Sequence, residues 1–178
     1  MTVAILVHLL VDPDREVQFP ALKAVANMLT TETTEIVDKA LDQHLLDNLL
    51  QMALQEPWCK LSQSLQEICF CFNNVACGTE LQIQSLLSHP NLWEHVLTHL
   101  IPKSVDLRQK KEAFLIVSNA VLTCTDDQLL ALVLCNSKDR LVSFFEAIVH
   151  VLTTMTADCE AINSSFNVLT RCFELHPD

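Results

Sequence analysis

The feature that most constrains the fold of this 178-residue chain is an internal repeat. Three segments resemble one another: ALKAVANMLTTETTEIVDKAL, LQEICFCFNNVACGTELQIQSLL and KEAFLIVSNAVLTCTDDQLLALV. Each ends an apolar, helix-like stretch on an asparagine, passes through a short turn that contains threonine, and begins another helix with an acid or an amide near its start. The shared position is occupied by Asn27, Asn74 and Asn119, at separations of 47 and 45 residues.

Periods of roughly 40 to 47 residues are typical of armadillo and HEAT repeats. The spacing therefore predicts an all-α, right-handed armadillo-type superhelical solenoid of three-helix repeats. A chain with a single glycine and with leucine recurring at helical spacing also favours helices joined by short polar turns. We expect one solenoid segment over 1–178, with repeats near 1–30 (partial), 31–78, 79–124 and 125–178. The predicted first helices are 33–42, 80–88 and 126–135, the second helices 3–11, 44–54, 90–101 and 139–154, and the third helices 14–30, 59–77, 106–123 and 158–173.

Turn and cap signals support this segmentation. Gly78 follows a predicted third helix and is expected to be a left-handed cap, while Thr79 and Thr125 place hydroxyl acceptors at helix beginnings. The last repeat departs from the pattern, because Arg171, at a separation of 52, best matches the place of a fourth asparagine. The chain begins directly in a second helix, which we interpret as part of a longer solenoid.

Charge and cysteine usage limit the classes of partner and compartment. A formal charge of −11 argues against nucleic acid and makes a basic partner the natural complement, although many proteins are acidic merely to stay soluble. No apolar run approaches the roughly 20 residues that span a bilayer, so we expect no membrane partner.

Most of the eight cysteines fall in apolar-periodic segments, which predicts a reducing compartment, cytoplasm or nucleus. The same pattern predicts that Cys69, Cys77, Cys124 and Cys172 are mostly buried free thiols.

No motif in the sequence points to catalysis or to a cofactor. Glu94-His95 with His99 places two imidazoles one turn apart, but the order is not HExxH and no third ligand has a suitable spacing. Cys69 and Cys71 point to different faces of a helix, and a chain with one glycine cannot form a glycine-rich phosphate loop. We therefore expect no enzyme activity, no metal and no cofactor.

The segments ALKAVANMLT, IVDKALDQHLLDNLLQMAL, FNNVACGTELQIQSLL and KEAFLIVSNA, taken in order, resemble the later armadillo repeats of the importin-alpha family, roughly the sixth to the ninth. FNNVACGTELQIQ is similar to that family's SNITAG followed by QIQ, and the resemblance covers nearly the whole chain. It implies a nuclear-import adaptor that binds Lys/Arg-rich localisation signals in a concave groove. An importin-beta-type carrier would then bind through regions outside this chain.

The resemblance also implies which residues bind the peptide. In that family a third-helix asparagine bonds to the peptide backbone, and a tryptophan four residues earlier stacks on Lys and Arg stems. The asparagines here are Asn27, Asn74 and Asn119, and the family's acid seven residues earlier is kept as Glu67 and Glu112. The tryptophan is replaced by Lys23, Phe70 and Leu115.

Two other interpretations stay open at the level of sequence. The asparagines could cap a helix or bond to a neighbouring repeat, and Phe70 and Leu115 could be ordinary core residues. The chain could also be an armadillo scaffold that has lost basic-signal binding and holds a different segment in its groove.

Overall fold

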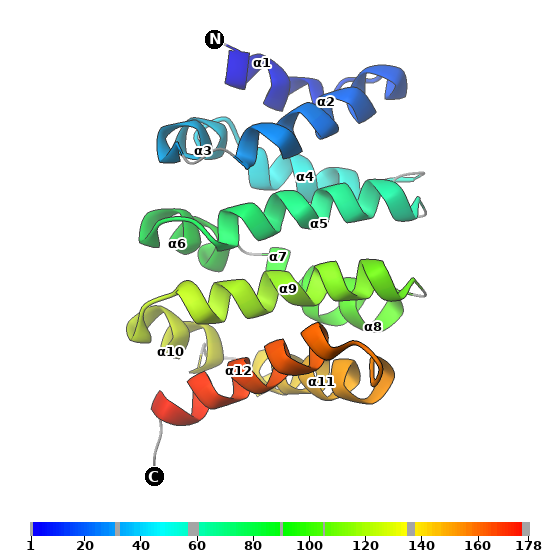
Figure 1. Ribbon diagram of the computed structural model, residues 1–178. Helices are drawn as coiled ribbons and strands as arrows, with labels where there is room; N and C mark the ends of the chain where they lie inside the picture. Colours follow the sequence, from blue (N-terminus) through cyan, green and yellow to red (C-terminus); the bar gives the residue numbers. More distant parts are fainter. Residues whose placement is uncertain are drawn as a thin grey trace.

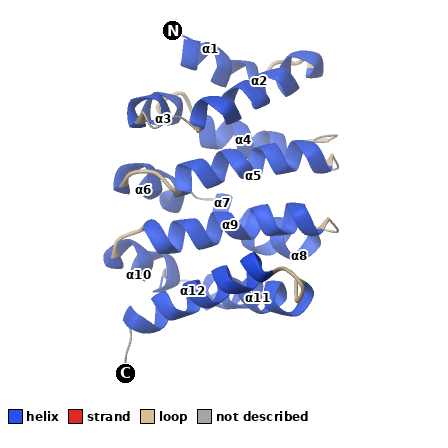
Figure 2. Ribbon diagram, in the orientation of Figure 1, coloured by secondary structure: helices blue, strands red, loops and turns tan. Residues whose placement is uncertain are grey.

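The computed structural model describes residues 2–30, 33–56, 61–89, 91–104, 106–134 and 138–175, and most of these residues are helical. No strand occurs in these ranges (Figure 2). The helices are α1 Thr2–Leu9, α2 Arg15–Leu29, α3 Thr34–Leu41, α4 Leu45–Leu54, α5 Ser62–Ala76, α6 Glu80–Ser88, α7 Leu92–His95, the π-helical η2 Val96–Leu100, α8 Ile101–Lys103, α9 Leu107–Thr123, α10 Asp126–Leu134, α11 Lys138–Thr154 and α12 Cys159–Leu175. The all-α prediction is confirmed, and the predicted helix ranges agree with these bounds to within a few residues.

The helices form an armadillo-type solenoid in which helices of the same kind stack on one another (Figure 1). The long third helices α2, α5, α9 and α12 lie side by side and make one face. The short first helices α3, α6 and α10 stack along one edge, and α11 packs on η2 and α8 behind the third helices. A continuous apolar core runs through the stack, with Phe72, Trp93, Phe114 and Phe144 as its largest buried side chains. None of the described helices is long and apolar enough to cross a membrane.

Aspartate caps begin three of the four third helices. The Asp14 carboxylate accepts the Glu16 N–H at 2.9 Å, and Asp106 accepts the Arg108 N–H at 2.9 Å. Asp158 accepts the N–H groups of residues 160 and 161 at 3.1 and 3.0 Å. A carboxylate at this position satisfies N–H groups that the helix itself leaves unpaired, and it also complements the helix dipole. The third helices therefore begin at fixed points, which aligns their first turns along the same side of the solenoid.

Two buried glutamines join the first helices of successive units. Gln82 and Gln128 each complete a capping box, with Thr79 and Thr125 respectively. The same side-chain amide of Gln82 donates to the Thr34 carbonyl at 3.2 Å and to the Asp38 carboxylate. Gln128 repeats the pattern one unit later, donating to the backbone carbonyl of residue 80 at 3.1 Å and to Gln84 Oε1 at 3.0 Å. Each glutamine thus caps its own helix and bonds to the preceding first helix.

The prediction of a left-handed cap at Gly78 is wrong, since no glycine in the described residues has a positive φ. The local contacts of Gly78 concern space and not backbone conformation. A Cβ on Gly78 would lie 2.0 Å from the Oε1 atom of Gln82, which accepts the Thr79 N–H at 3.0 Å. A side chain at position 78 would therefore have to displace the Gln82 side chain from the place that it occupies here.

The thiol predictions are partly confirmed. Cys69 and Cys124 are buried free thiols, as is Cys71, whereas Cys172 is half-buried. The prediction for Cys77 is wrong because that residue is the exposed C-cap of α5 and lies beyond the apolar stripe of the helix. Cys159, the first residue of α12, is also exposed; Cys59 and Cys135 lie outside the described residues.

Replacing Gln82 tests whether the glutamine contacts hold the units together. Gln82→Ala removes one half of a capping box and both bonds to α3, so we expect the free energy of unfolding to fall by about 2 kcal/mol. Gln51→Ala, on the exposed side of α4, is the matched control and should change it by less than about 0.5 kcal/mol. Urea denaturation followed by circular dichroism measures both, and equal effects would contradict this role for Gln82.

Alkylation with N-ethylmaleimide followed by peptide mass spectrometry tests the burial of the thiols. Burial raises the pKa of the Cys69 thiol to about 12 and raises that of Cys71 further, so both should react only after denaturation. Cys77 and Cys159 should be modified in the native protein because they are exposed. Rapid native labelling of Cys69 would refute the packing described for α5.

Candidate functional site

A cleft of about 940 Å³ opens on the third-helix face, where α5, α9 and the start of α12 meet. Its floor and walls include apolar side chains, among them Phe70, which is 38% exposed, and Met155, which is buried. The residues lining the cleft are Gln66, Glu67, Phe70, Leu107, Arg108, Lys111, Glu112, Thr154, Met155, Thr156, Ala157, Asp158 and Cys159. Three of the seven residues that the sequence nominates for peptide binding, Glu67, Phe70 and Glu112, therefore lie together in one cleft.

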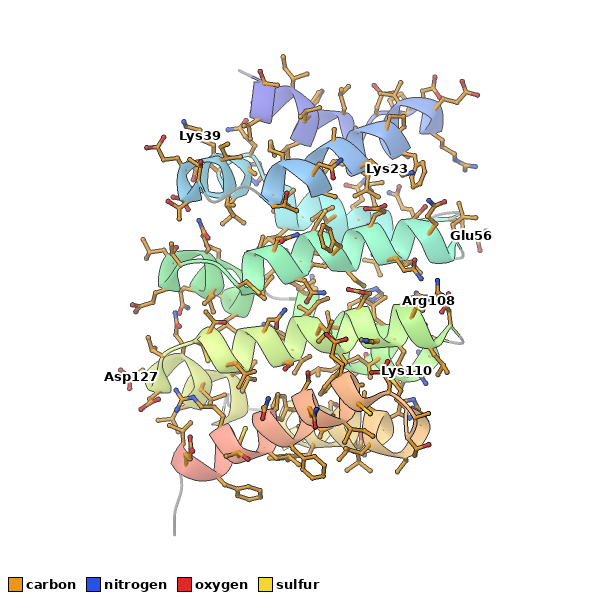
Figure 3. The ribbon with its side chains drawn as sticks, viewed as in Figure 1. Lys23, Lys39, Glu56, Arg108, Lys110 and Asp127 are labelled. Carbon is orange, nitrogen blue, oxygen red and sulfur yellow. The ribbon has the colours of Figure 1, made fainter. Side chains whose placement is uncertain are left out.

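The cleft contains both acidic and basic side chains. Glu67 on α5 and Glu112 on α9 supply carboxylates. Arg108 lies in the first turn of α9, at the edge that Figure 3 shows opposite the first helices. Burial raises the pKa of Glu112 above its usual range, and the Lys111 ammonium and a hydrogen bond from Asn73 oppose that rise in part. Glu112 is thus a partly desolvated acid whose ionised form is favoured by an approaching cation.

Lys111 joins α9 to the beginning of α12. Its Nζ lies 3.2 Å from Asp158 Oδ2 and also bonds to Glu160. The bond to Glu160 is the largest cause that raises the pKa of Lys111. The Ala161 N–H is the main group that lowers the pKa of Asp158, with Lys111 adding to the effect. Lys111 and Asp158 are therefore both charged at neutral pH, and the ammonium neutralises acids at the α12 side of the cleft.

Asn73 forms a polar bridge between α5 and α9. Its Nδ2 donates to the Glu112 carbonyl at 3.1 Å and to Glu112 Oε2 at 3.3 Å, and its Oδ1 accepts from Asn119 Nδ2 at 3.4 Å. Asn73 is only 7% exposed, so these bonds satisfy an amide that would otherwise be buried without partners. The bridge fixes the Glu112 side chain at the cleft wall.

The remaining predicted site residues lie outside the cleft lining. Asn27 is exposed on α2, and Leu115 is half-buried on α9. Asn74 is half-buried and donates to the Phe70 carbonyl of its own helix at 2.9 Å, whereas Asn119 donates to Asn73. The side-chain amides of Asn74 and Asn119 thus each already donate one hydrogen bond within the protein.

The Lys23 ammonium lies 4.7 Å from the centre of the Phe19 ring. Lys23 therefore makes a cation–π contact within α2 itself.

Sequence reasoning missed Asn73, Arg108, Lys111 and Asp158 as residues of this site. Asn73 is adjacent to the predicted Asn74, but a one-residue step on a helix turns a side chain by about 100° and carries it from the outer face toward the next unit. An Asp before a predicted helix marks a cap and could have located Asp158. No local signal pairs Lys111 with acids that far downstream.

Solved structures similar to this chain include engineered and designed proteins. An engineered protein of the Northeast Structural Genomics Consortium superimposes with a TM-score of 0.73 at 20% identity, covering 96% of this chain and 62% of that chain. A designed armadillo repeat protein in complex with the peptide (KR)4 gives 0.64 at 18% identity, covering 95% and 81%. Computationally designed armadillo repeat proteins for modular peptide recognition give 0.62 at 15% identity, covering 93% and 70%. These likenesses establish the armadillo-type fold.

The chain spans less than two thirds of the length of the first of these structures. No protein-family profile matches the sequence, and no curated protein is significantly similar to it. Among the residues that the structure describes, no group of three or more His, Cys, Asp or Glu side chains could hold a metal ion.

Proposed function

We propose that this chain is a protein-binding armadillo scaffold that holds an extended, basic peptide segment across α5, α9 and the start of α12. The observation that carries the proposal is the convergence of Glu67, Phe70 and Glu112 in a single cleft of about 940 Å³. Two carboxylates beside an aromatic ring suit a Lys or Arg side chain, whose apolar stem packs on the ring while its charged end meets an acid. The designed armadillo protein solved with (KR)4 supports this use of the fold.

At the finer level, we propose that the bound segments are nuclear-localisation signals and that the protein is an import adaptor working between cytoplasm and nucleus. The resemblance of its repeats to the later repeats of importin-alpha supports this proposal. An importin-beta-type carrier would bind through other parts of the protein. Because Phe70 and Leu115 replace tryptophans, we expect modest affinity that depends mainly on charge.

The second candidate is a scaffold that binds a segment without a basic cluster. Two observations favour it: the Asn119 amide donates to Asn73, and Lys111 places a positive charge inside the cleft. Peptides of opposite charge distinguish the two candidates, since only the first predicts a preference for the basic one.

Fluorescence anisotropy with a labelled octapeptide of alternating Lys and Arg tests the basic-segment proposal. It should bind more tightly than a matched Asp/Glu peptide at about 50 mM salt and should weaken at about 300 mM, because salt screens exposed charges. Glu67→Gln should weaken binding by roughly threefold to tenfold, because it removes one cleft carboxylate without changing its shape. Glu94→Gln, on the exposed surface of α7, is the matched control and should leave affinity unchanged. Equal affinity for the basic and acidic peptides would support the second candidate instead.

The pH dependence of the same affinity tests the part played by Glu112. A cation binds the ionised carboxylate, so affinity should fall as the pH is lowered through the pKa of Glu112. Because burial raises that pKa, the fall should begin at a higher pH than it would for an exposed glutamate. In Glu112→Gln this early phase should disappear, leaving weaker binding that falls only where ordinary carboxylates titrate. An unchanged pH profile in the variant would exclude Glu112 as a contact of the peptide.

A further inference from the structure

An intramolecular salt bridge fills part of the cleft. Lys111, from the middle of the third-helix face, reaches the first turn of α12 and bonds to the carboxylates of Asp158 and Glu160. The lysine side chain is 24% exposed, and Asp158 is held in place as the cap of α12 by two backbone N–H groups. The Asp158 carboxylate is therefore positioned by the backbone before any ligand arrives, and the ammonium that meets Asp158 and Glu160 belongs to the protein.

We propose that Lys111 competes intramolecularly with the ligand. Its ammonium occupies the position beside Asp158 and Glu160 that a basic residue of the ligand would otherwise take. This inference rests on the proposed function, since it concerns the same cleft. A ligand Lys or Arg that bonds to these acids must first displace a charge equal to its own. The exchange replaces one ion pair with another, so it adds little to affinity and leaves the displaced ammonium in the cleft as a repelling charge.

This competition makes the cleft specific for the order of basic and apolar residues in the bound segment. Glu67 and Glu112 stand at the α5 and α9 walls and can meet one or two basic residues. The lining also includes Leu107, Met155 and Ala157, and together with the neutralised Asp158 these side chains favour an apolar or small residue. The preferred ligand class is therefore a segment with basic residues followed or preceded by apolar ones, and an unbroken run of Lys and Arg is disfavoured.

Lys111→Met tests the competition directly, because it keeps the length and apolar stem of the side chain and removes the ammonium. The Lys/Arg octapeptide should bind at least about fivefold more tightly than it binds the wild type at low salt, and the gain should shrink at high salt. Lys39→Met is the matched control: it removes the same charge and another lysine–acid pair, Lys39–Glu35, on α3, away from the cleft (Figure 3). Lys111→Arg keeps the cation and should bind like the wild type.

The double variant Lys111→Met/Glu160→Gln should lose part of the gain, because one of the two freed acids is gone and Asp158 remains. Lys111→Gln keeps an N–H donor for Asp158 and should give a gain of the same sign, so the test does not depend on the folding of one variant. Circular dichroism establishes the helical content of each protein. The proposal that Lys111 competes with the ligand would be overturned by either of two results. One is a gain in peptide affinity no larger than that of Lys39→Met, and the other is a gain that is undiminished in the double variant.

The two proposals fail in different ways. If the wild type prefers the basic peptide and Glu67→Gln weakens it while Lys111→Met changes nothing, only the role of Lys111 is refuted. If the wild type shows no such preference but Lys111→Met acquires one, the competition is supported and the basic-segment function of the wild type is refuted. If neither protein prefers the basic peptide, both proposals are refuted.

Discussion

Side-chain amides that bond across units are the interaction on which this solenoid depends. The apolar core supplies most of the driving force for stacking, but hydrophobic contact has no direction and would tolerate units that slide or rotate against one another. Gln82 and Gln128 remove that freedom at the first helices, and Asn73 removes it between α5 and α9. Because each of these amides is buried, a shifted unit would leave donors unpaired, which is costly away from water.

The same network determines the geometry of the cleft. Asn73 holds both the backbone and the carboxylate of Glu112, so the acid at the cleft wall is positioned by a residue of the neighbouring unit. The Asp158 cap and Lys111 similarly fix the opposite wall, where α12 begins. Contacts between units therefore preform the cleft. In a preformed site, less conformational entropy is lost when a ligand binds, because its side chains are already ordered.

The sequence predicts the helices and their stacking period, since these follow from periodicity along a single chain. The three predicted residues that meet in the cleft came instead from the resemblance to importin-alpha repeats. Contacts between units could not be predicted in the same way. Asn73 and Asn74 are neighbours of the same type in the sequence, but Asn73 is buried and Asn74 is only half-buried. Which of the two amides faces the next unit depends on how the adjacent third helices are placed against each other. The Gly78 prediction failed for a related reason, because the residue has no positive φ and its close contact is with Gln82, which lies in the next helix.

Charge placement is the other part that the sequence leaves open. A net charge of −11 suggests an acidic groove, but Lys111 neutralises part of the acid in the cleft, through a pairing between residues far apart in the chain. Overall charge therefore describes the attraction of basic partners at long range, whereas the local pairs decide which side chains the groove accepts.

The central claim, that the third-helix cleft receives a basic segment, is tested most directly by following the side-chain amide and backbone signals of the labelled protein by NMR as the Lys/Arg peptide is added. We predict that shifts concentrate on α5, α9 and the first turn of α12, including the side-chain amides of Asn73 and Asn74. Shifts confined to the first helices, or an even and small change over the whole surface, would contradict the account.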